Sequence, residues 1–212
     1  ELPATELAVP FQTVAVKDGV VYVATAGYFT VAGGEVRWGN SFLWAFDAAN
    51  GSLLFKAPYA TSIWDPYFLA PTVAGGKVFL NGGTLRLTTF AFDALTGEQR
   101  WAREVRDGVA TFVTPAINAD DVFNANAGAV SLLDAATGEL KGSAPVVANM
   151  EGSTVYASAP VISDTGSVLA LSGSGYQETI NSPVMGYGTK RSLNRFTTFP
   201  LGRTWSTAPL YD

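Results

Sequence analysis

Short apolar runs interrupted by small or acidic residues recur along the whole chain. In each of four segments, two such runs flank a polar step of Asp-Gly, Gly-Gly, Asp-Asp or Asp-Thr-Gly, which is typical of two strands joined by a tight turn. The four segments are residues 13–23, 71–80, 115–124 and 160–169. The pattern therefore predicts four β-hairpins along the sequence.

A second element follows each predicted hairpin and repeats more strictly. Its complete form, Ala-Phe-Asp-Ala-Leu-Thr-Gly-Glu-Gln-Arg-Trp, occupies residues 91–101, and residues 45–55 and 132–142 align with it without gaps. Residues 195–205 form a degenerate fourth copy in which Thr197 replaces the aspartate. The aspartate can accept hydrogen bonds from turn amides, and the glycine that follows can adopt positive φ. The turn residues predicted in this way are Asp47, Gly51, Asp93, Gly97, Asp134 and Gly138.

Together the two elements predict a unit of four short antiparallel strands, A to D, that recurs about every 40–50 residues. Such a unit is the signature of a β-propeller blade. A β-sandwich would have similar strands but needs no sequence repeat at this period. We therefore expect an all-β propeller with blades at about 9–57, 70–103, 114–143 and 159–207.

The end of the sequence predicts that residues 1–212 are one part of a larger propeller. Residues 206–212 repeat the openings of three earlier blades, so 208–212 are expected to start a fifth blade. An open arc of blades would leave unpaired edges and uncovered apolar faces, whereas propellers close with roughly four to eight blades. A four-bladed ring, or an eight-bladed ring made by two chains, is the alternative.

The complete repeat resembles the quinoprotein-type (PQQ-like) repeat. That family includes pyrroloquinoline-quinone (PQQ) dehydrogenases and a non-enzymatic outer-membrane assembly lipoprotein. The resemblance covers about residues 9 to 207. It implies a ring of roughly seven or eight blades located outside the cytoplasm, in the periplasm, at the cell surface or secreted. It also implies that a Trp at the end of each repeat docks between neighbouring blades, so Trp101 is expected to be buried. The matching positions are Phe55, Trp101, Gly142 and Trp205.

Composition excludes most catalytic chemistry. The chain has no cysteine and no histidine, which rules out disulfides, thiolate nucleophiles, Ser-His-Asp triads and metal sites built on imidazole or thiolate. The net charge of −5 argues against nucleic acid or an anionic membrane as a partner. No apolar run approaches the length of a membrane span. We therefore predict no catalytic, cofactor-binding or metal-binding residues.

Connection lengths predict where a partner binds. In a propeller blade the A–B and C–D turns lie on one side, and the B–C and D–A connections lie on the other. All the long connections, residues 26–41, 57–69, 143–158 and 172–191, belong to the second side. Each of their aromatic residues alone is explained by packing, but their accumulation favours a binding face. The candidates are Tyr28, Trp38, Trp64, Tyr67, Phe68, Tyr176 and Tyr187, and the same segments hold Phe29 and Tyr59.

Two functional interpretations follow. The preferred one is a non-catalytic scaffold that binds a protein or glycan through this aromatic face, with Trp38, Trp64 and Tyr67 as the expected anchors. The alternative, implied by the resemblance, is a fragment of a PQQ-dependent alcohol or sugar dehydrogenase. In that case the quinone and calcium ligands would lie in other blades.

Overall fold

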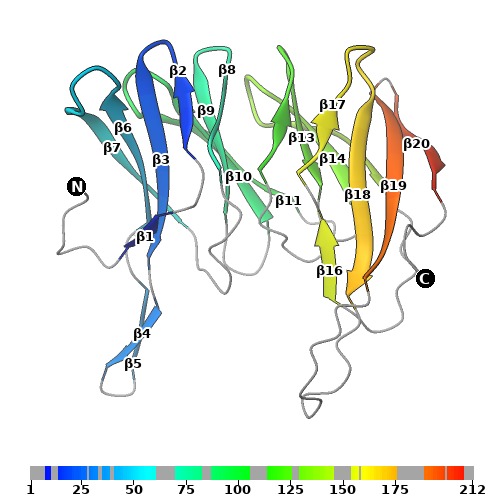
Figure 1. The fold of residues 1–212 in the computed structure, drawn as a ribbon, viewed down its shortest axis with the longest axis horizontal. Helices are drawn as coiled ribbons and strands as arrows, with labels where there is room; N and C mark the ends of the chain where they lie inside the picture. Colours follow the sequence, from blue (N-terminus) through cyan, green and yellow to red (C-terminus); the bar gives the residue numbers. More distant parts are fainter. Residues whose placement is uncertain are drawn as a thin grey trace. The chain divides into compact units, whose positions relative to one another are not determined.

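The chain folds into antiparallel β-sheets that follow one another along the sequence (Figure 1). The computed structural model has two compact units, Glu1–Val105 and Arg106–Asp212, and each holds one five-stranded and one four-stranded sheet. The residues that the structure describes are 8–10, 14–27, 29–32, 35–38, 41–60, 70–82, 87–105, 114–125, 129–145, 154–157, 159–175, 189–198 and 200–207. The expected start of a fifth blade at 208–212 lies outside them. Within these ranges no helix is long and apolar enough to cross a membrane.

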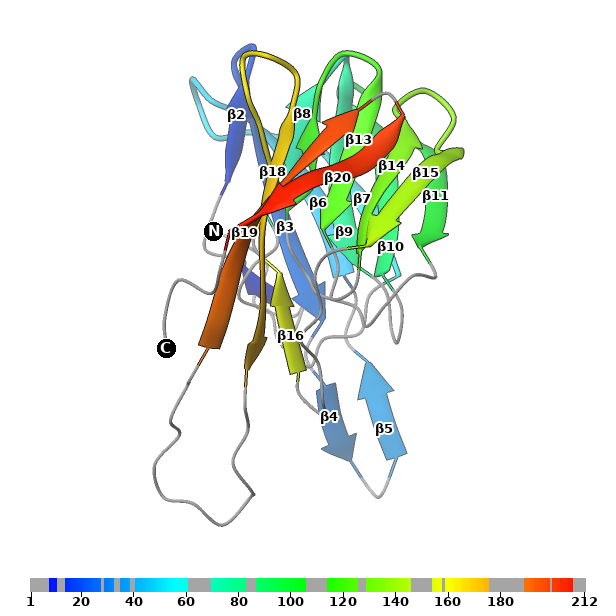
Figure 2. The ribbon, with the colours of Figure 1, turned by 90° about the vertical axis from the view of Figure 1, so that its right-hand side faces the viewer.

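The first sheet is interrupted by a separate two-stranded ribbon. Its strands are β1 (Ala8–Pro10), β2 (Ala15–Lys17), β3 (Val20–Gly27), β6 (Ser41–Asp47) and β7 (Leu53–Tyr59), and the ribbon consists of β4 (Phe29–Ala32) and β5 (Glu35–Trp38). The sheet order is β1-β3-β6-β7, and β2 also pairs with β3. β1 and β2 pair with opposite halves of β3, so they share one edge of the sheet. The ribbon extends away from the β2–β3 turn (Figure 1, Figure 2).

The other three sheets repeat the same arrangement. The second contains β8 (Thr72–Ala74), β9 (Lys77–Gly82), β10 (Leu87–Asp93) and β11 (Gln99–Val105). The third contains β12 (Ala116–Ile117), β13 (Asp121–Ala125), β14 (Ala129–Asp134) and β15 (Leu140–Pro145). The fourth contains β16 (Thr154–Ala157), β17 (Val161–Ile162), β18 (Val168–Gly175), β19 (Thr189–Thr198) and β20 (Leu201–Ser206), with β16 and β17 sharing the edge beside β18. The prediction of an all-β chain of four-stranded antiparallel units is confirmed.

One irregularity occurs at the same repeat position in all four sheets. The pairing of the two outer strands shifts directly after Ala45, Ala91, Leu132 and Arg195. The partners of these four residues are Phe55, Trp101, Gly142 and Trp205. Each shift leaves one residue of the outer strand unpaired, as in a β-bulge. The gap-free sequence alignment is therefore also a structural alignment, and it includes the degenerate fourth copy.

Each unit has its own apolar core, because alternate residues of a strand point to opposite faces of its sheet. In the first unit the fully buried side chains include Leu43, Val78, Phe79, Leu80 and Phe92. In the second unit one cluster joins the third and fourth sheets and contains Phe123, Ala125, Val130, Leu132, Ala144, Val168, Ala170 and Phe196.

Several segments that the sequence predicts as loops are strands. Tyr59 ends β7 with only 7% of its surface exposed, so the expectation that it lies in an open loop is wrong. β4 and β5 occupy half of 26–41, β16 lies within 143–158, and β18 and β19 extend into 172–191. β18 and β19 are longer because backbone pairing continues beyond the apolar stretch by which a strand is recognised in a sequence, whereas β4, β5 and β16 are additional strands.

Candidate functional site

The turn between the two outer strands has the same hydrogen bonds in the first three sheets. In the second sheet, Asp93 Oδ1 accepts from the backbone N–H groups of Leu95 and Thr96, both at 3.0 Å. The N–H of Gly97 donates to the carbonyl of Asp93 at 2.9 Å. Asp47 and Asp134 form the equivalent turns. The turn glycines Gly51, Gly97 and Gly138 have φ of 73°, 72° and 74°, a region that residues with a Cβ rarely adopt.

The fourth sheet closes this turn with other residues. Thr197 Oγ1 donates to the carbonyl oxygens of Pro200 at 3.0 Å and Gly202 at 3.2 Å. Pairing continues to Thr198 and Leu201, and Leu201 stands at the repeat position that is glycine in the other copies. The degenerate repeat therefore keeps the turn but places a large side chain where the other turns have none.

Ion pairs reinforce the turns of the second and third sheets. Arg100 lies 2.8 Å from Asp93 and 2.9 Å from Glu98. The hydrogen bond from Arg100, together with the amides of Thr96 and Leu95, holds the pKa of Asp93 well below its usual range. In the first sheet the position of Arg100 is taken by Leu54, which is 50% exposed.

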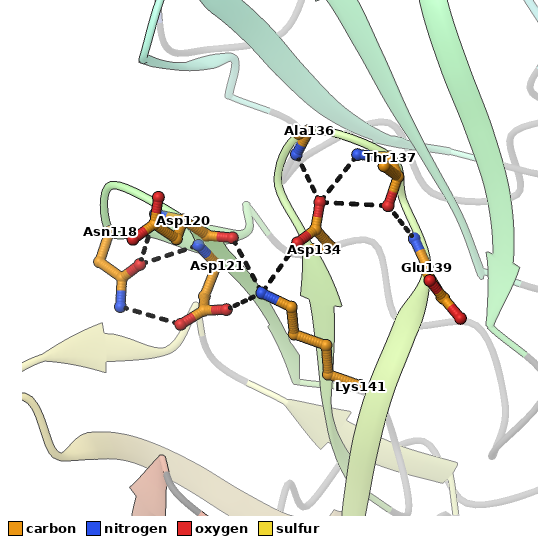
Figure 3. Close-up of polar contacts among 8 residues, drawn as sticks. All are labelled: Asn118, Asp120, Asp121, Asp134, Ala136, Thr137, Glu139 and Lys141. Carbon is orange, nitrogen blue, oxygen red and sulfur yellow. Dashed lines mark hydrogen bonds and ion pairs between the residues drawn. The ribbon is translucent and has the colours of Figure 1, made fainter.

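Lys141 makes the corresponding contacts in the third sheet (Figure 3). Its Nζ lies 2.8 Å from Asp121 Oδ1 and 2.9 Å from Asp134 Oδ2. The hydrogen bond from Lys141 and the amide of Thr137 lower the pKa of Asp134 well below its usual range. The pKa of Lys141 is raised, chiefly by its hydrogen bond to Asp121. The ammonium group of Lys141 thus lies between the two carboxylates, where a bound cation would otherwise have to sit.

In each of the first three sheets, a backbone hydrogen bond also joins the turn between the two outer strands to the turn between the two inner strands. The N–H groups of Ala48, Ala94 and Ala135 donate to the carbonyls of Gly19, Gly76 and Asp120, at 2.8, 2.9 and 2.9 Å. In the part of the chain that the structure describes, no group of three or more Asp or Glu side chains is arranged to hold a metal ion. The polar residues of these turns stabilise the sheets.

Phe55 joins the first sheet to the second. A Cβ built on Gly97 would lie 2.8 Å from two atoms of the Phe55 ring, so the aromatic side chain fills the space that glycine leaves. Nearby, the hydroxyl of Tyr22 donates to the carbonyl of Ala94 at 2.9 Å. The ring of Tyr59 packs edge-on against Phe90 with centroids 5.6 Å apart. Burial raises the pKa of the Tyr59 hydroxyl.

In the corresponding contact of the second unit, the small residue stands where the first unit has the large one, and the large residue stands where it has the small one. Gly142 of β15 stands at the position of Phe55, and Leu201 stands at the position of Gly97. A Cβ on Gly142 would lie 3.5 Å from the Leu201 Cβ. The small and large residues have thus exchanged sides of the contact. This contact joins two consecutive repeats, so neither repeat alone indicates it.

The two tryptophans that end repeats differ in exposure. Trp101 is half-buried, with its ring 5.8 Å from that of Phe79, so it is less buried than the repeat predicts. Trp205 is 41% exposed.

The predicted aromatic binding face is only partly described. Trp38 is paired with Phe29 across the β4–β5 ribbon, and the description of Trp38 ends at its backbone. The ribbon lies in the B–C connection, on the side opposite the β2–β3 turn (Figure 2). The other candidates, Tyr28, Trp64, Tyr67, Phe68, Tyr176 and Tyr187, lie outside the described residues.

Sequence reasoning missed an aromatic row on β6. Phe42, Trp44 and Phe46 occupy alternate positions and therefore share one face; the Trp44 and Phe46 rings are stacked at 6.3 Å. The ammonium of Lys56 lies 3.9 Å from the centroid of Phe42 and 4.6 Å from that of Trp44, a cation–π arrangement. The alternation of aromatics at 42, 44 and 46 was the available signal.

Comparison with protein families assigns residues 5–196 to the family described as outer membrane protein assembly factor BamB, of the PQQ type. No curated protein matches the chain.

Several solved structures share the fold. A quinohemoprotein alcohol dehydrogenase from Comamonas testosteroni has 18% identity and a TM-score of 0.65, covering 96% of this chain and 37% of that one. A europium-containing methanol dehydrogenase has 12% identity and a TM-score of 0.59, covering 95% and 43%. BamB from Moraxella catarrhalis has 16% identity and a TM-score of 0.54, covering 96% and 62%. The chain thus spans less than two thirds of each of these structures. Its four sheets match part of a larger β-propeller, and the predicted fold class is confirmed.

Proposed function

Because the chain belongs to the PQQ-type repeat family described as outer membrane protein assembly factor BamB, we propose that it is a non-catalytic β-propeller scaffold that binds a protein outside the cytoplasm. The family's description refers to the assembly of proteins, which favours a protein partner over a glycan. The absence of cysteine and histidine from the sequence leaves little chemistry for catalysis.

The observation that carries the proposal is the difference between the two ends of the sheets. At one end the turns are short, and their carboxylates are bonded to amides or to Arg100 and Lys141. At the other end the first sheet carries the β4–β5 ribbon, in which two aromatic residues are directly opposite one another. Connections held by a rigid sheet are where binding residues concentrate, and aromatic residues dominate the energetics of such surfaces.

The test is a binding measurement with matched variants. A column carrying the 212-residue chain captures a partner from an extracytoplasmic extract, and the dissociation constant of the purified partner is then measured. Trp38→Ala combined with Trp64→Ala should weaken binding about tenfold or more, with the melting temperature nearly unchanged. Leu95→Ala, at an 84% exposed position on the turn side, is the control and should leave affinity unchanged. Unchanged affinity with a large loss of stability would show that both tryptophans only pack their loops. Loss of binding after deglycosylation of the partner would favour a glycan.

The dehydrogenase alternative is tested separately. The natural protein that contains these 212 residues is mixed with PQQ and Ca²⁺, and quinone fluorescence is titrated against protein. We expect no saturable binding. Saturation at one quinone per chain would contradict the non-catalytic proposal.

A further inference from the structure

The first sheet keeps the turn aspartate but has no cation at the repeat position that pairs with it in the second and third sheets. There, Arg100 and Lys141 lie 2.8 and 2.9 Å from the Oδ2 atom of the turn aspartate. In the fourth sheet Thr197 and Thr204 stand at the aspartate and cation positions, so both charges are missing. Of the four repeats, only the first combines a carboxylate, Asp47, with an apolar residue at the cation position.

A β-bulge sets the place of this residue in each sheet. The shift in pairing leaves Arg100 without a cross-strand partner in the second sheet and Lys141 in the third. Leu54 is the corresponding residue of the first sheet. A bulge re-aims a side chain, and both cations reach the turn aspartate from this position. Leucine is shorter and has no donor, so Leu54 cannot replace their hydrogen bond.

Only one oxygen of Asp47 is used by its own turn. Oδ1 accepts from the backbone N–H groups of Ala49 at 2.7 Å and Asn50 at 3.2 Å. Among the residues that the structure describes, no Lys or Arg side chain pairs with this carboxylate, and Lys17, at the end of β2, lies 3.8 Å from Asp18 instead. The half-buried Asp47 therefore has one oxygen available to a donor from outside the described chain.

Two exposed leucines adjoin this carboxylate. Leu53 is 52% exposed and Leu54 is 50% exposed. Leu53 is paired with Phe46, the residue directly before Asp47. The first turn thus combines an acceptor without a cation and an apolar surface, whereas the same place in the second and third sheets carries Arg100 and Lys141.

A sheet packed before the first one would leave this place accessible. The second sheet has such a neighbour, because the ring of Phe55 fills the space beside Gly97. Its residues equivalent to the two leucines, Gln99 and Arg100, are nonetheless exposed. Exposure is therefore a property of this repeat position, whatever lies before the first sheet.

We propose that Asp47, Leu53 and Leu54 form a docking surface for a protein segment that carries an arginine between apolar residues. The arginine binds Oδ2 of Asp47 as Arg100 binds that of Asp93, and its apolar neighbours cover the leucines. A guanidinium matches a carboxylate in geometry and charge. Burial of the leucines supplies most of the affinity, because an exposed ion pair alone contributes little. The surface lies at the short-turn end of the sheet, so this proposal is independent of the proposed binding by the long connections.

Methyl NMR tests the surface in the natural protein that contains these 212 residues, labelled in its leucine methyl groups. The probe is the peptide acetyl-Leu-Arg-Leu-amide, and acetyl-Leu-Gln-Leu-amide is the matched control. The arginine peptide should shift the methyl signals of Leu53 and Leu54 saturably, with a dissociation constant about threefold or more below that of the glutamine peptide. Equal affinities for the two peptides, or no shift with either, would overturn the proposal.

Variants separate the carboxylate from the leucines. Asp47→Asn keeps an acceptor for the turn amides and should make the two peptides bind equally. Leu54→Arg recreates the second-sheet pair within the chain, so it should weaken binding of the arginine peptide about threefold or more, whereas Leu54→Met should preserve it. Asp18→Asn removes an exposed carboxylate from the adjoining turn and should have no effect. Circular dichroism checks that every variant is folded. An undiminished preference for the arginine peptide in Asp47→Asn or Leu54→Arg contradicts the assignment.

Photo-crosslinking identifies the occupant. Benzoylphenylalanine at position 54 of the natural protein, irradiated in an extracytoplasmic extract, should crosslink to a segment of another protein in which an arginine adjoins apolar residues. Asp47→Asn should reduce the yield about threefold or more. A crosslink to another part of the same chain, or to a second copy, would show that the protein covers this surface itself, and the proposed partner would be excluded.

Discussion

A single glycine illustrates how much of the fold rests on individual residues. Gly97 and Gly51 have φ of 72° and 73°, but only Gly97 is covered by an aromatic ring. Alanine at either position adopts an unfavourable φ, at a cost of about 1 kcal/mol. Gly97→Ala must also displace Phe55, so it should destabilise the chain by about 1–3 kcal/mol more than Gly51→Ala.

Chemical denaturation checks this difference in the free energy of unfolding, with Gly51→Ala as the control for the cost of the unfavourable φ. Equal losses of stability for the two variants would mean that Phe55 does not pack on Gly97.

Two turn aspartates, Asp93 and Asp134, should make the free energy of unfolding depend on pH in the acidic range. The pKa values of Asp93 and Asp134 are lowered in the folded state from a normal value of 3.8, so the folded state binds these protons less readily than the unfolded state. Their contribution is therefore complete above pH 3.8 and is lost as the pH falls through the lowered values.

The free energy of unfolding, measured between pH 7 and pH 2, should decline below about pH 4. Asp93→Asn combined with Asp134→Asn should make that decline shallower. A decline of the same slope in this variant would assign the acid sensitivity to other carboxylates.

Residue roles confined to one turn could be predicted from the sequence, and roles that span sheets could not. An aspartate followed by Thr-Gly specifies its own turn because all the hydrogen bonds are local. The burial of Tyr59 depends on Phe90 and on the carbonyl of Thr25, which are brought close only by folding. The half-burial of Trp101 is likewise set by its surroundings rather than by its repeat.

At the level of elements, the contact between Gly142 and Leu201 can be tested by placing the large side chain at position 142 and the glycine at position 201. Gly142→Phe alone should crowd Leu201 and destabilise the chain by about 1–3 kcal/mol. Adding Leu201→Gly recreates the Phe55–Gly97 combination and should recover about 1 kcal/mol or more of that loss.

A double-mutant cycle of unfolding free energies measures the coupling. Strict additivity of the two single changes would show that the two positions do not contact each other.

The strands themselves were largely predictable, whereas their lengths were not. Apolar alternation located the hairpins because a half-buried strand displays period two in its sequence. The β4–β5 ribbon does alternate apolar and polar residues on both sides of Gly33-Gly34, from Phe29 to Trp38, but each run has only four residues. Runs this short, inserted between two longer strands, resemble a loop with scattered aromatic residues.

For the whole molecule, the repeat alone predicted a propeller, because four strands recurring at this period have few other solutions. Similarity to solved structures shows the fold at identities of 12–18%, where side-chain chemistry is no longer shared. The binding partner and the roles of Trp38 and Trp64 are therefore proposals, which the variants above test.

The reversed contact at Gly142 and Leu201 also bears on how such a gene can change by unequal recombination. If each repeat-ending residue meets the turn of the next repeat, loss of the second repeat would bring Phe55 to Gly138, an aromatic ring on a glycine. Loss of the third repeat would instead bring Trp101 to Leu201, and these two large side chains would clash where the other contacts pair a large side chain with a glycine. On this condition, loss of the second repeat would be easier to inherit than loss of the third.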